Sequence, residues 1–324
     1  MTTTSDHTQQ QAKDVLRGAS RGRDWLRQRG LPYSDEIPLE ASTGEFDGGG
    51  QYGIEVPVIN SFRILEQTLK GLREEGVPVT RFNETLGAFL LSDAEVRDML
   101  DLCRESEVGM VFALGPRPEY DRKAAFYRGG FGQSQGRRIN NNDALAVIAD
   151  EAIRLTGLGC RGLIAYDPGV FRMLKLMRAE GALPSGLQLK ASSHCIVSNP
   201  FTAAGYADDG ADSVTTQHDL GLSVLQEMRR MSPSLVLDIP TDVYGNKGGF
   251  IRFPEVAELV QIAAPMFLKI GASAQAHPHD PVSDATVRAR VQRVALAMEY
   301  LDKSGLEAVY IGSKAPQRCV PVSA

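Results

Sequence analysis

From residue 52 onward, short runs rich in β-branched residues alternate with amphipathic stretches of helical period. Strand-like runs cover eight segments: 53–59, 77–83, 109–115, 161–167, 187–193, 212–216, 234–239 and 265–270. Helical periods fill the gaps, at 61–75, 92–105, 142–156, 168–180, 201–207, 219–231, 253–263 and 283–303. This alternation is typical of βα units that build a parallel sheet covered by helices.

Eight βα units predict an α/β fold of the (β/α)8 TIM-type barrel class, which needs about 250 residues. An open doubly wound sheet is the competing architecture, but no Gly-x-Gly-x-x-Gly turn follows the first strand, as a dinucleotide-binding sheet requires. Two more apolar runs, 88–91 and 308–312, could each be a further strand, so the predicted number of strands is uncertain by one. We expect a polar, partly flexible arm with a helix-competent stretch over 1–45, the barrel over 46–305 and a C-terminal tail over 306–324.

Four charged residues lie inside the apolar runs: Glu55, Lys190, Asp238 and Lys269. Each stands at the alternation phase opposite to its apolar neighbours, since successive side chains of a strand point to opposite faces. In a closed barrel this phase points all four into the interior, and closure makes Glu55 and Lys269 neighbours. Burying an unpaired ion costs several kcal/mol. The four charges are therefore expected either to neutralise one another or to serve a ligand.

The working face of such a barrel is the C-terminal end of its strands. Five residues are predicted to be catalytic: Glu55, Lys190, His194, Asp238 and Lys269. A buried lysine, whose pKa burial lowers, acts as a base or a carbonyl-binding amine, while a carboxylate relays protons and a histidine supplies a second acid-base group. Eight residues are predicted to bind substrate, with the cationic ones clamping an anion: Arg81, Asn83, Arg117, Asp167, Lys247, Gly248, Gly249 and Ser273.

Two short motifs follow the predicted strands. In the Gly-rich stretch 244–250, the glycine backbone N–H groups and Lys247 are expected to hold phosphate, with a plain turn as the alternative. The run 192–195 looks like a nucleophile cluster. Because adjacent strand residues point to opposite faces, Ser193 and Cys195 are not expected to share a pocket with His194.

A divalent metal is an open alternative at the same strand ends, with Mg or Mn preferred over Zn. Its predicted ligands are Glu55, Asp238, Asp242 and His194, because oxygen ligands suit these ions and a histidine can add a nitrogen. The pair His277 and His279 also resembles a metal-binding motif, with a solvated surface loop as the alternative. The four cysteines form no C-x-x-C pair, which argues against a zinc ribbon and a disulfide framework.

The longest irregular segment, 116–139, is basic and aromatic. Its cations are Arg117, Arg122, Lys123, Arg128, Arg137 and Arg138, interleaved with Phe126, Tyr127 and Phe131. It is longer than a structural connector needs to be. Three interpretations stay open: a lid that closes over an anionic substrate, a patch that touches RNA, and plain disorder.

Three segments together, the strand of Glu55, residues 187–192 and residues 238–250, resemble bacterial proteins of the U32-type peptidase group, over about residues 50–280. The resemblance implies a βα barrel. Characterised members of the wider group imply work on RNA, or quinone hydroxylation with an iron–sulfur cluster held by four cysteines. The cysteines of this chain fall on a predicted helix, a strand start, a strand end and the tail, so an iron–sulfur cluster is not expected. No protease constellation supports a peptidase activity.

The 324 residues, 43% of them hydrophobic and 23% charged, suit one large globular α/β domain. A formal net charge of −5 gives no global attraction to nucleic acid or to anionic membranes, so neither is an expected partner. The polar N-terminus shows no secretory signal and no run reaches transmembrane length, so a cytoplasmic location is expected. The sequence leaves open whether the protein forms a homo-oligomer.

The leading hypothesis is an enzyme that acts on a small anionic metabolite, a carboxylate or a phosphate ester, by proton abstraction of the lyase or isomerase type. A metal-dependent hydrolase, including a U32-like peptidase, is one alternative. An accessory barrel that binds RNA or a protein partner through the basic loop is the other.

Overall fold

The computed structural model describes residues 20–117 and 137–323. Eight parallel strands close into a barrel in chain order: β1 Tyr52–Pro57, β2 Arg81–Asn83, β3 Gly109–Ala113, β4 Gly162–Ala165, β5 Gln188–Ala191, β6 Ser213–Thr215, β7 Val236–Pro240 and β8 Met266–Lys269. Every predicted strand is present, although most are shorter than predicted. The TIM-type barrel is confirmed, and the open doubly wound sheet is wrong.

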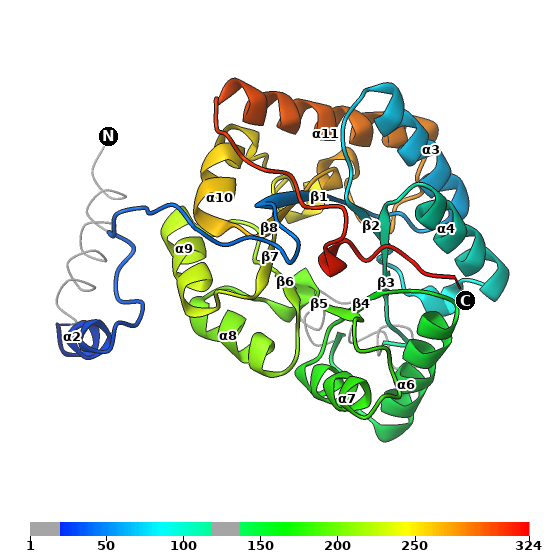
Figure 1. The fold of residues 1–324 in the computed structure, drawn as a ribbon, viewed down its shortest axis with the longest axis horizontal. Coiled ribbons are helices and arrows are strands. Elements are labelled where there is room, and N and C mark those ends of the chain that lie inside the picture. The colour runs from blue at the N-terminus through cyan, green and yellow to red at the C-terminus, as the bar shows by residue number, and fades with distance from the viewer. Residues whose placement is uncertain (1–19, 118–136, 324) are drawn as a thin grey trace, which may run out of the picture. The chain divides into compact units, whose positions relative to one another are not determined.

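Helices surround the barrel, as Figure 1 shows. They are α3 Phe62–Glu74, α4 Asp93–Glu105, α6 Asn142–Gly157, α7 Pro168–Ala179, α8 Pro200–Asp208, α9 Leu222–Met231, α10 Val256–Ala263 and α11 Asp284–Lys303. Most begin at a residue whose side chain accepts a hydrogen bond from the first turn, such as Ser61 before α3 and Asn141 before α6. None of the described helices is both long and apolar enough to cross a membrane.

The chain divides into two compact units, residues 1–39 and residues 40–324. The described part of the first unit contains α2, Ser20–Gln28, after which the guanidinium of Arg29 lies 4.0 Å from the centre of the Trp25 ring. The second unit contains the barrel and also the segment after α11, predicted as a separate tail.

The two additional apolar runs are not strands of the barrel. Residues Ala88–Leu90 form one turn of 3-10 helix, η1, so the strand considered there is wrong. Near the C-terminus, Tyr310 makes a single parallel bridge to Tyr52 at the edge of β1.

The strand register places the charged residues on the inner face. Glu55 of β1 pairs in register with Arg81 of β2 on one side and with Lys269 of β8 on the other. The neighbouring residues on the strands, such as Leu189 and Leu237, are buried in the apolar layer between barrel and helices. The predicted alternation is therefore confirmed: apolar side chains face the helices and charged ones the barrel interior.

The C-terminal segment covers the end of the barrel where the strands begin. It crosses this end in Figure 1, drawn in red. The backbone N–H of Met110 donates to the Cys319 carbonyl at 3.2 Å, and the N–H of Val322 donates to the Gly159 carbonyl at 3.0 Å. The segment thus closes the barrel opposite to its working face.

Gly109, the first residue of β3, leaves no room for a side chain below this segment. A Cβ atom there would lie 1.6 Å from the Arg318 carbonyl oxygen, so Gly109→Ala must displace the C-terminal segment. We expect this variant to lose about 1–3 kcal/mol of unfolding free energy in denaturant titrations. Gly186→Ala is the control, because a Cβ at Gly186 meets nothing within 4 Å. Equal stability of the two variants would contradict the packing described here.

Candidate functional site

A buried cluster of charges occupies the barrel interior, centred on the Glu55 carboxylate. Lys190 Nζ lies 2.6 Å from both carboxylate oxygens of Glu55, and Arg81 Nε donates to Oε2 at 2.7 Å. Asn83 Nδ2 donates to Oε1 at 3.0 Å. Asp238 completes the cluster, 2.7 Å from Arg81 Nη2 and 2.8 Å from Lys190 Nζ. Strands on opposite sides of the barrel are therefore connected through one ionic network.

Lys269 gives this network one cation more than it has carboxylates. Its Nζ lies 3.4 Å from Glu55 Oε1, farther than Lys190 or Arg81. Two carboxylates, Glu55 and Asp238, face three cations, Arg81, Lys190 and Lys269, which leaves a net charge of +1 when all are ionised. The predicted neutralisation is thus confirmed for the interior of the network, and Lys269 is the cation in excess.

The electrostatics of the network follow from this count. Burial alone would raise the pKa of Glu55, but Lys190, Arg81 and Lys269 outweigh it and hold that pKa well below its usual range. Burial, followed by repulsion from Lys190, lowers the pKa of Lys269 to about 8, although Glu55 and Asp238 partly oppose the shift. With this pKa, about a tenth of Lys269 is neutral amine at pH 7 and about half at pH 8.

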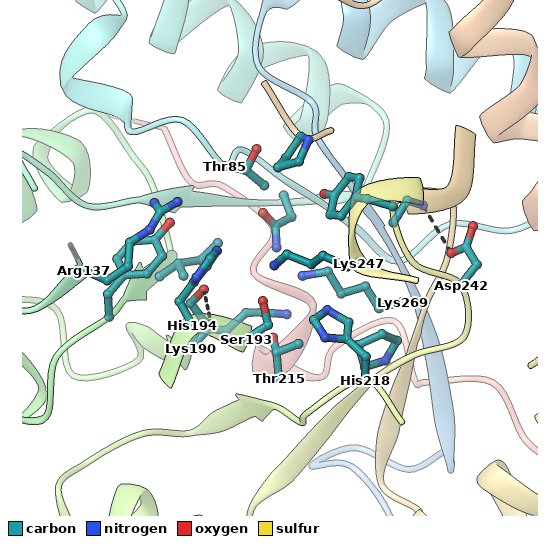
Figure 2. Close-up of a pocket in the computed structure, with 18 of the residues that line it drawn as sticks. Thr85, Arg137, Lys190, Ser193, His194, Thr215, His218, Asp242, Lys247 and Lys269 are labelled. Carbon is teal, nitrogen blue, oxygen red and sulfur yellow. Dashed lines mark hydrogen bonds between the residues drawn. The ribbon is translucent and has the colours of Figure 1, made fainter. Parts of the chain in front are cut away.

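A pocket opens above the network at the C-terminal ends of the strands, and Figure 2 shows ten of its lining residues by name. Its floor includes Asn83, Lys190 and Lys269. The rest of the lining is Thr85, Arg137, Ile164, Tyr166, Ser192, Ser193, His194, Thr215, His218, Pro240, Asp242, Tyr244, Lys247, Ala272, Pro278 and His279. Of the five predicted catalytic residues, Lys190, His194 and Lys269 line the pocket, and Glu55 and Asp238 lie beneath it.

Apart from the histidines, the charged side chains that the described residues contribute to the lining are four cations, Arg137, Lys190, Lys247 and Lys269, and one carboxylate, Asp242. That carboxylate is already engaged. Asp242 Oδ1 accepts from the backbone N–H groups of Gly271 and Ala272, at 2.8 and 3.2 Å, and Oδ2 accepts from the N–H and hydroxyl of Ser273, at 2.9 and 2.6 Å. Asp242 therefore fixes the loop that follows β8, including the 3-10 turn η7, Ala272–Ala274.

Three histidines of the pocket are held neutral at pH 7. Burial, followed by repulsion from Arg137, lowers the pKa of His194 well below its usual range. Burial lowers the pKa of His218 to about 4, with Lys247 and Lys269 adding to the effect. Burial and then Arg137 lower the pKa of His279 to about 4. A neutral imidazole can both donate and accept a hydrogen bond.

The Gly-rich loop after β7 does not offer its backbone to a ligand. It forms the 3-10 turn η5, Gly245–Lys247, in which the N–H groups of Lys247 and Gly249 donate to the Tyr244 carbonyl and that of Gly248 donates to the Gly245 carbonyl. Gly248 and Gly249 adopt positive φ, 97° and 62°, and are not part of the pocket lining. Their placement does not support the predicted role in holding phosphate through backbone N–H groups, whereas Lys247 does reach the pocket.

Several predicted substrate-binding residues have structural partners instead. Arg81 is 2% exposed, bound to both carboxylates of the network and to the Gln317 carbonyl, and its guanidinium lies 3.8 Å from the centre of the Phe267 ring. Asp167 caps α7 through the N–H of Gly169. Ser273 binds Asp242. None of these three lines the pocket, so their placement does not support direct contact with a substrate.

Arg117 and Asn83 also lie close to the working face. Arg117 is buried, donates to the carbonyls of Thr85 and Leu86, and places its guanidinium 4.8 Å from the centre of the Tyr166 ring. It is not part of the pocket lining. Asn83 lines the pocket and donates to Glu55, so it connects the lining with the ionic network.

The residues predicted as metal ligands do not gather around one point. In residues 20–117 and 137–323, no three His, Cys, Asp or Glu side chains are grouped so that they could hold a metal ion. Glu55 and Asp238 bind cationic side chains, and Asp242 binds backbone N–H groups. His277 and His279 contact each other, with ring centres 4.9 Å apart, and His279 alone of the two lines the pocket. A metal cofactor stays a prediction.

Ser193 shares the pocket with His194, and the prediction that it does not is wrong. Strand β5 ends at Ala191, and Ser193–Cys195 form the 3-10 turn η4, in which strand parity no longer applies. Cys195 is buried, and its Sγ donates to the Ala165 carbonyl at 3.6 Å, outside the pocket lining.

The basic segment 116–139 lies mostly outside the described residues, which include 116–117 and 137–139 of it. Arg122, Lys123, Phe126, Tyr127, Arg128 and Phe131 are therefore not placed. Of its described arginines, Arg137 is 7% exposed and lines the pocket, 5.3 Å from the centre of the Tyr166 ring. Arg138 donates to the Tyr166 carbonyl at 2.9 Å and to the Tyr206 hydroxyl at 3.2 Å. Both turn toward the barrel.

His218 is the main pocket residue that the sequence analysis missed. His218 follows β6, so the rule that functional residues lie at the C-terminal ends of the barrel strands could have identified it. Thr215, Tyr166 and Thr85 were missed as well, because hydroxyl-bearing residues at strand ends are too common to single out.

No protein-family model matches this chain, and no curated protein matches it. Among solved structures, the U32 peptidase Mk0906 is similar, with 14% identity, a TM-score of 0.40 and coverage of 85% of this chain and 93% of the other. The YdjI aldolase from Escherichia coli K12 is similar at 13% identity and TM-score 0.44, covering 78% and 90%. The truncated 3-deoxy-D-arabino-heptulosonate 7-phosphate synthase from Thermotoga maritima is similar at 12% identity and TM-score 0.45, covering 85% and 96%.

A U32 peptidase is thus among the solved structures that this barrel resembles, in agreement with the resemblance noted in the sequence. The barrel itself rests on the strand pairing described above. Similarity at these identities and TM-scores gives no information about the chemistry of this chain.

Proposed function

We propose that this chain is an enzyme that abstracts a proton from a small anionic molecule, next to a carbonyl group, in a reaction of the lyase or isomerase type. The observation that carries the proposal is the position of Lys269. It is the cation in excess of a buried ionic network, and its side chain lines the floor of a pocket at the C-terminal end of the barrel.

The residues of the ionic network have different functions in this proposal. Lys190 and Arg81 form ion pairs with both Glu55 and Asp238 in the interior. Lys269 can then exchange its proton without leaving an unpaired carboxylate, because the network is neutral when Lys269 is uncharged. An amine whose pKa lies near the working pH is an efficient general base. Glu55 holds the ammonium form in place at 3.4 Å after proton transfer.

The pocket lining supports an anionic substrate. Lys247 and Arg137 contribute positive charge to the pocket, and the one carboxylate that the described residues place in its lining, on Asp242, is bound to the loop after β8. The neutral imidazoles of His194 and His218 add uncharged hydrogen-bond donors to the lining. Such donors contribute most in a site from which water is excluded.

The geometry does not favour the two alternative functions. A metal-dependent hydrolase would need a group of metal-ligating side chains, and the described residues show none. For RNA binding, the described arginines of the basic segment turn toward the barrel rather than away from it.

Deuterium exchange tests the proposed reaction without knowledge of the full substrate. The protein is incubated in D₂O with a panel of 2-oxo acids, hydroxyketones and phosphate esters of both, and loss of the C–H signal next to the carbonyl is followed by proton NMR. We expect at least one class to exchange faster than in buffer, with a rate that rises with pH through about 8. If no class of the panel exchanges, the proton-abstraction proposal fails.

A further inference from the structure

The pocket contains a second cationic centre, separate from the ionic network, around Lys247. Lys247 comes from η5 after β7 and lines the pocket from the loop side. Figure 2 shows the side chains of Lys247 and Lys269 both reaching into the pocket, toward the side where His194 and Arg137 lie. The pocket therefore presents one ammonium group from the loop after β7 and one from the end of the neighbouring strand β8.

Lys247 has no anionic partner in the part of the chain that the structure describes. Burial, and then repulsion from Arg137, lowers its pKa, and no carboxylate of the described residues offsets the two effects. Lys269, by contrast, has Glu55 within ion-pair distance. A partly buried ammonium without a counter-ion, next to a guanidinium, is unfavourable unless an anion from outside joins it.

Backbone groups cannot supply this anion site. Within η5, the N–H groups of Gly245 and Asn246 donate to the carbonyls of Gln275 and Ala276, and that of Lys247 donates to the Tyr244 carbonyl. The N–H groups of residues 271–273 are bonded to the Asp242 carboxylate. In effect, Asp242 already occupies the cradle of backbone N–H groups after β8 that a ligand anion would otherwise enter. An anion in this pocket must therefore be held by side chains.

The donors around Lys247 come from several loops and hence from several directions. His194 lies after β5, His218 after β6 and His279 after β8, and all three line the pocket together with Lys247. A carboxylate accepts hydrogen bonds in one plane, whereas a phosphate group has three terminal oxygens that point in different directions. Donors that come from several loops around one ammonium group match a tetrahedral dianion better than a planar monoanion.

We propose that Lys247, with the surrounding histidines, forms a side-chain-built subsite for the phosphate group of a phosphorylated substrate. The inference rests on the proposed function, because it places the phosphate at Lys247 and the reacting carbonyl next to Lys269. It narrows the substrate class to phosphate monoesters of small carbonyl compounds.

The test uses inorganic phosphate as the probe, with isothermal titration calorimetry on the full chain at pH 7.5. Phosphate is expected to bind the unaltered protein, and Lys247→Met is expected to weaken binding by about 10- to 100-fold. Lys70→Met is the matched control, because Lys70 is exposed on α3 and its removal takes away the same charge. It is expected to leave binding unchanged. Thermal unfolding of both variants checks that each remains folded.

Three results would overturn the subsite: no phosphate binding, equal binding by Lys247→Met and the unaltered protein, or tighter binding of succinate than of phosphate. Its failure is distinct from failure of the proposed function. If deuterium exchange depends on Lys269 while Lys247→Met binds phosphate normally, the subsite is refuted and the reaction stands. If phosphate binding depends on Lys247 but no carbonyl compound exchanges, the subsite stands and the reaction is refuted.

Discussion

Replacing Lys269 with methionine is expected to slow deuterium exchange by about 100-fold or more, the usual contribution of a positioned general base. Methionine keeps the length of the side chain and removes the amine. The fold should survive, because the substitution removes the cation in excess and leaves Glu55 and Asp238 paired with Arg81 and Lys190. Exchange is measured by NMR with the panel compound that the unaltered protein processes best.

The pH dependence of exchange distinguishes a catalytic role of Lys269 from a purely structural one. The neutral amine is the base, so the rate should rise with pH through the pKa of about 8 and level off above it. The residual rate of Lys269→Met should lose this rise. Lys70→Met serves as the control and should match the unaltered protein. A Lys269→Met protein with full activity would contradict the assignment of the base.

Replacing Arg81 with methionine is expected to lower the free energy of unfolding by about 3–5 kcal/mol, the usual cost of removing one partner from a buried ion pair. Arg81 is 2% exposed and bonds to Glu55 at 2.7 Å and to Asp238 at 2.7 Å. Without it, two buried carboxylates share the remaining cations. Its bond to the Gln317 carbonyl, which connects the network to the C-terminal segment, is also lost.

A double-mutant cycle separates this electrostatic cost from lost packing. Adding Asp238→Asn to Arg81→Met removes the carboxylate that the arginine leaves behind, so the double variant should lose less stability than the sum of the two single variants. Additive losses, or a loss below about 1 kcal/mol for Arg81→Met, would show that the network does not depend on Arg81 as described.

The two substitutions together separate the functions of the network. Arg81 has two carboxylate partners, whereas Lys269 lies 3.4 Å from one oxygen of one carboxylate that Lys190 already approaches at 2.6 Å. The same network therefore predicts a large loss of stability without Arg81 and a large loss of activity without Lys269. A stability loss of similar size in both variants would contradict this division.

The barrel and its interior charges could be predicted from the sequence because both depend on local periodicity. A strand has period two, so Glu55, Lys190, Asp238 and Lys269 are assigned to one face by their neighbours alone. Closure of β1 onto β8 then fixes Glu55 and Lys269 as neighbours. The participation of Arg81 could not be predicted in the same way, since it depends on how far a long side chain reaches across the interior.

The pocket was harder to predict because it is built by turns. At Ser193 the strand has ended and a 3-10 turn begins, so the alternation rule fails there. Asp242 stands at a strand end like a ligand-binding residue, but it fixes the loop after β8 through backbone N–H groups. Sequence patterns do not reveal which backbone groups a carboxylate will meet. The same limit applies to Gly248 and Gly249, whose N–H groups donate to carbonyls of their own loop.

Whether Lys269 is the base is tested by the pKa of its amine, measured by NMR titration of protein labelled with ¹³C at lysine Cε and assigned by the signal missing from Lys269→Met. We expect a pKa of about 8. Because this value is lower than the ordinary value of 10.5, stability should also rise between pH 8 and 10.5, as the unfolded chain binds more protons there. A pKa at or above 10.5 would mean that Lys269 is a permanently charged member of the network, and the proposed base would be lost.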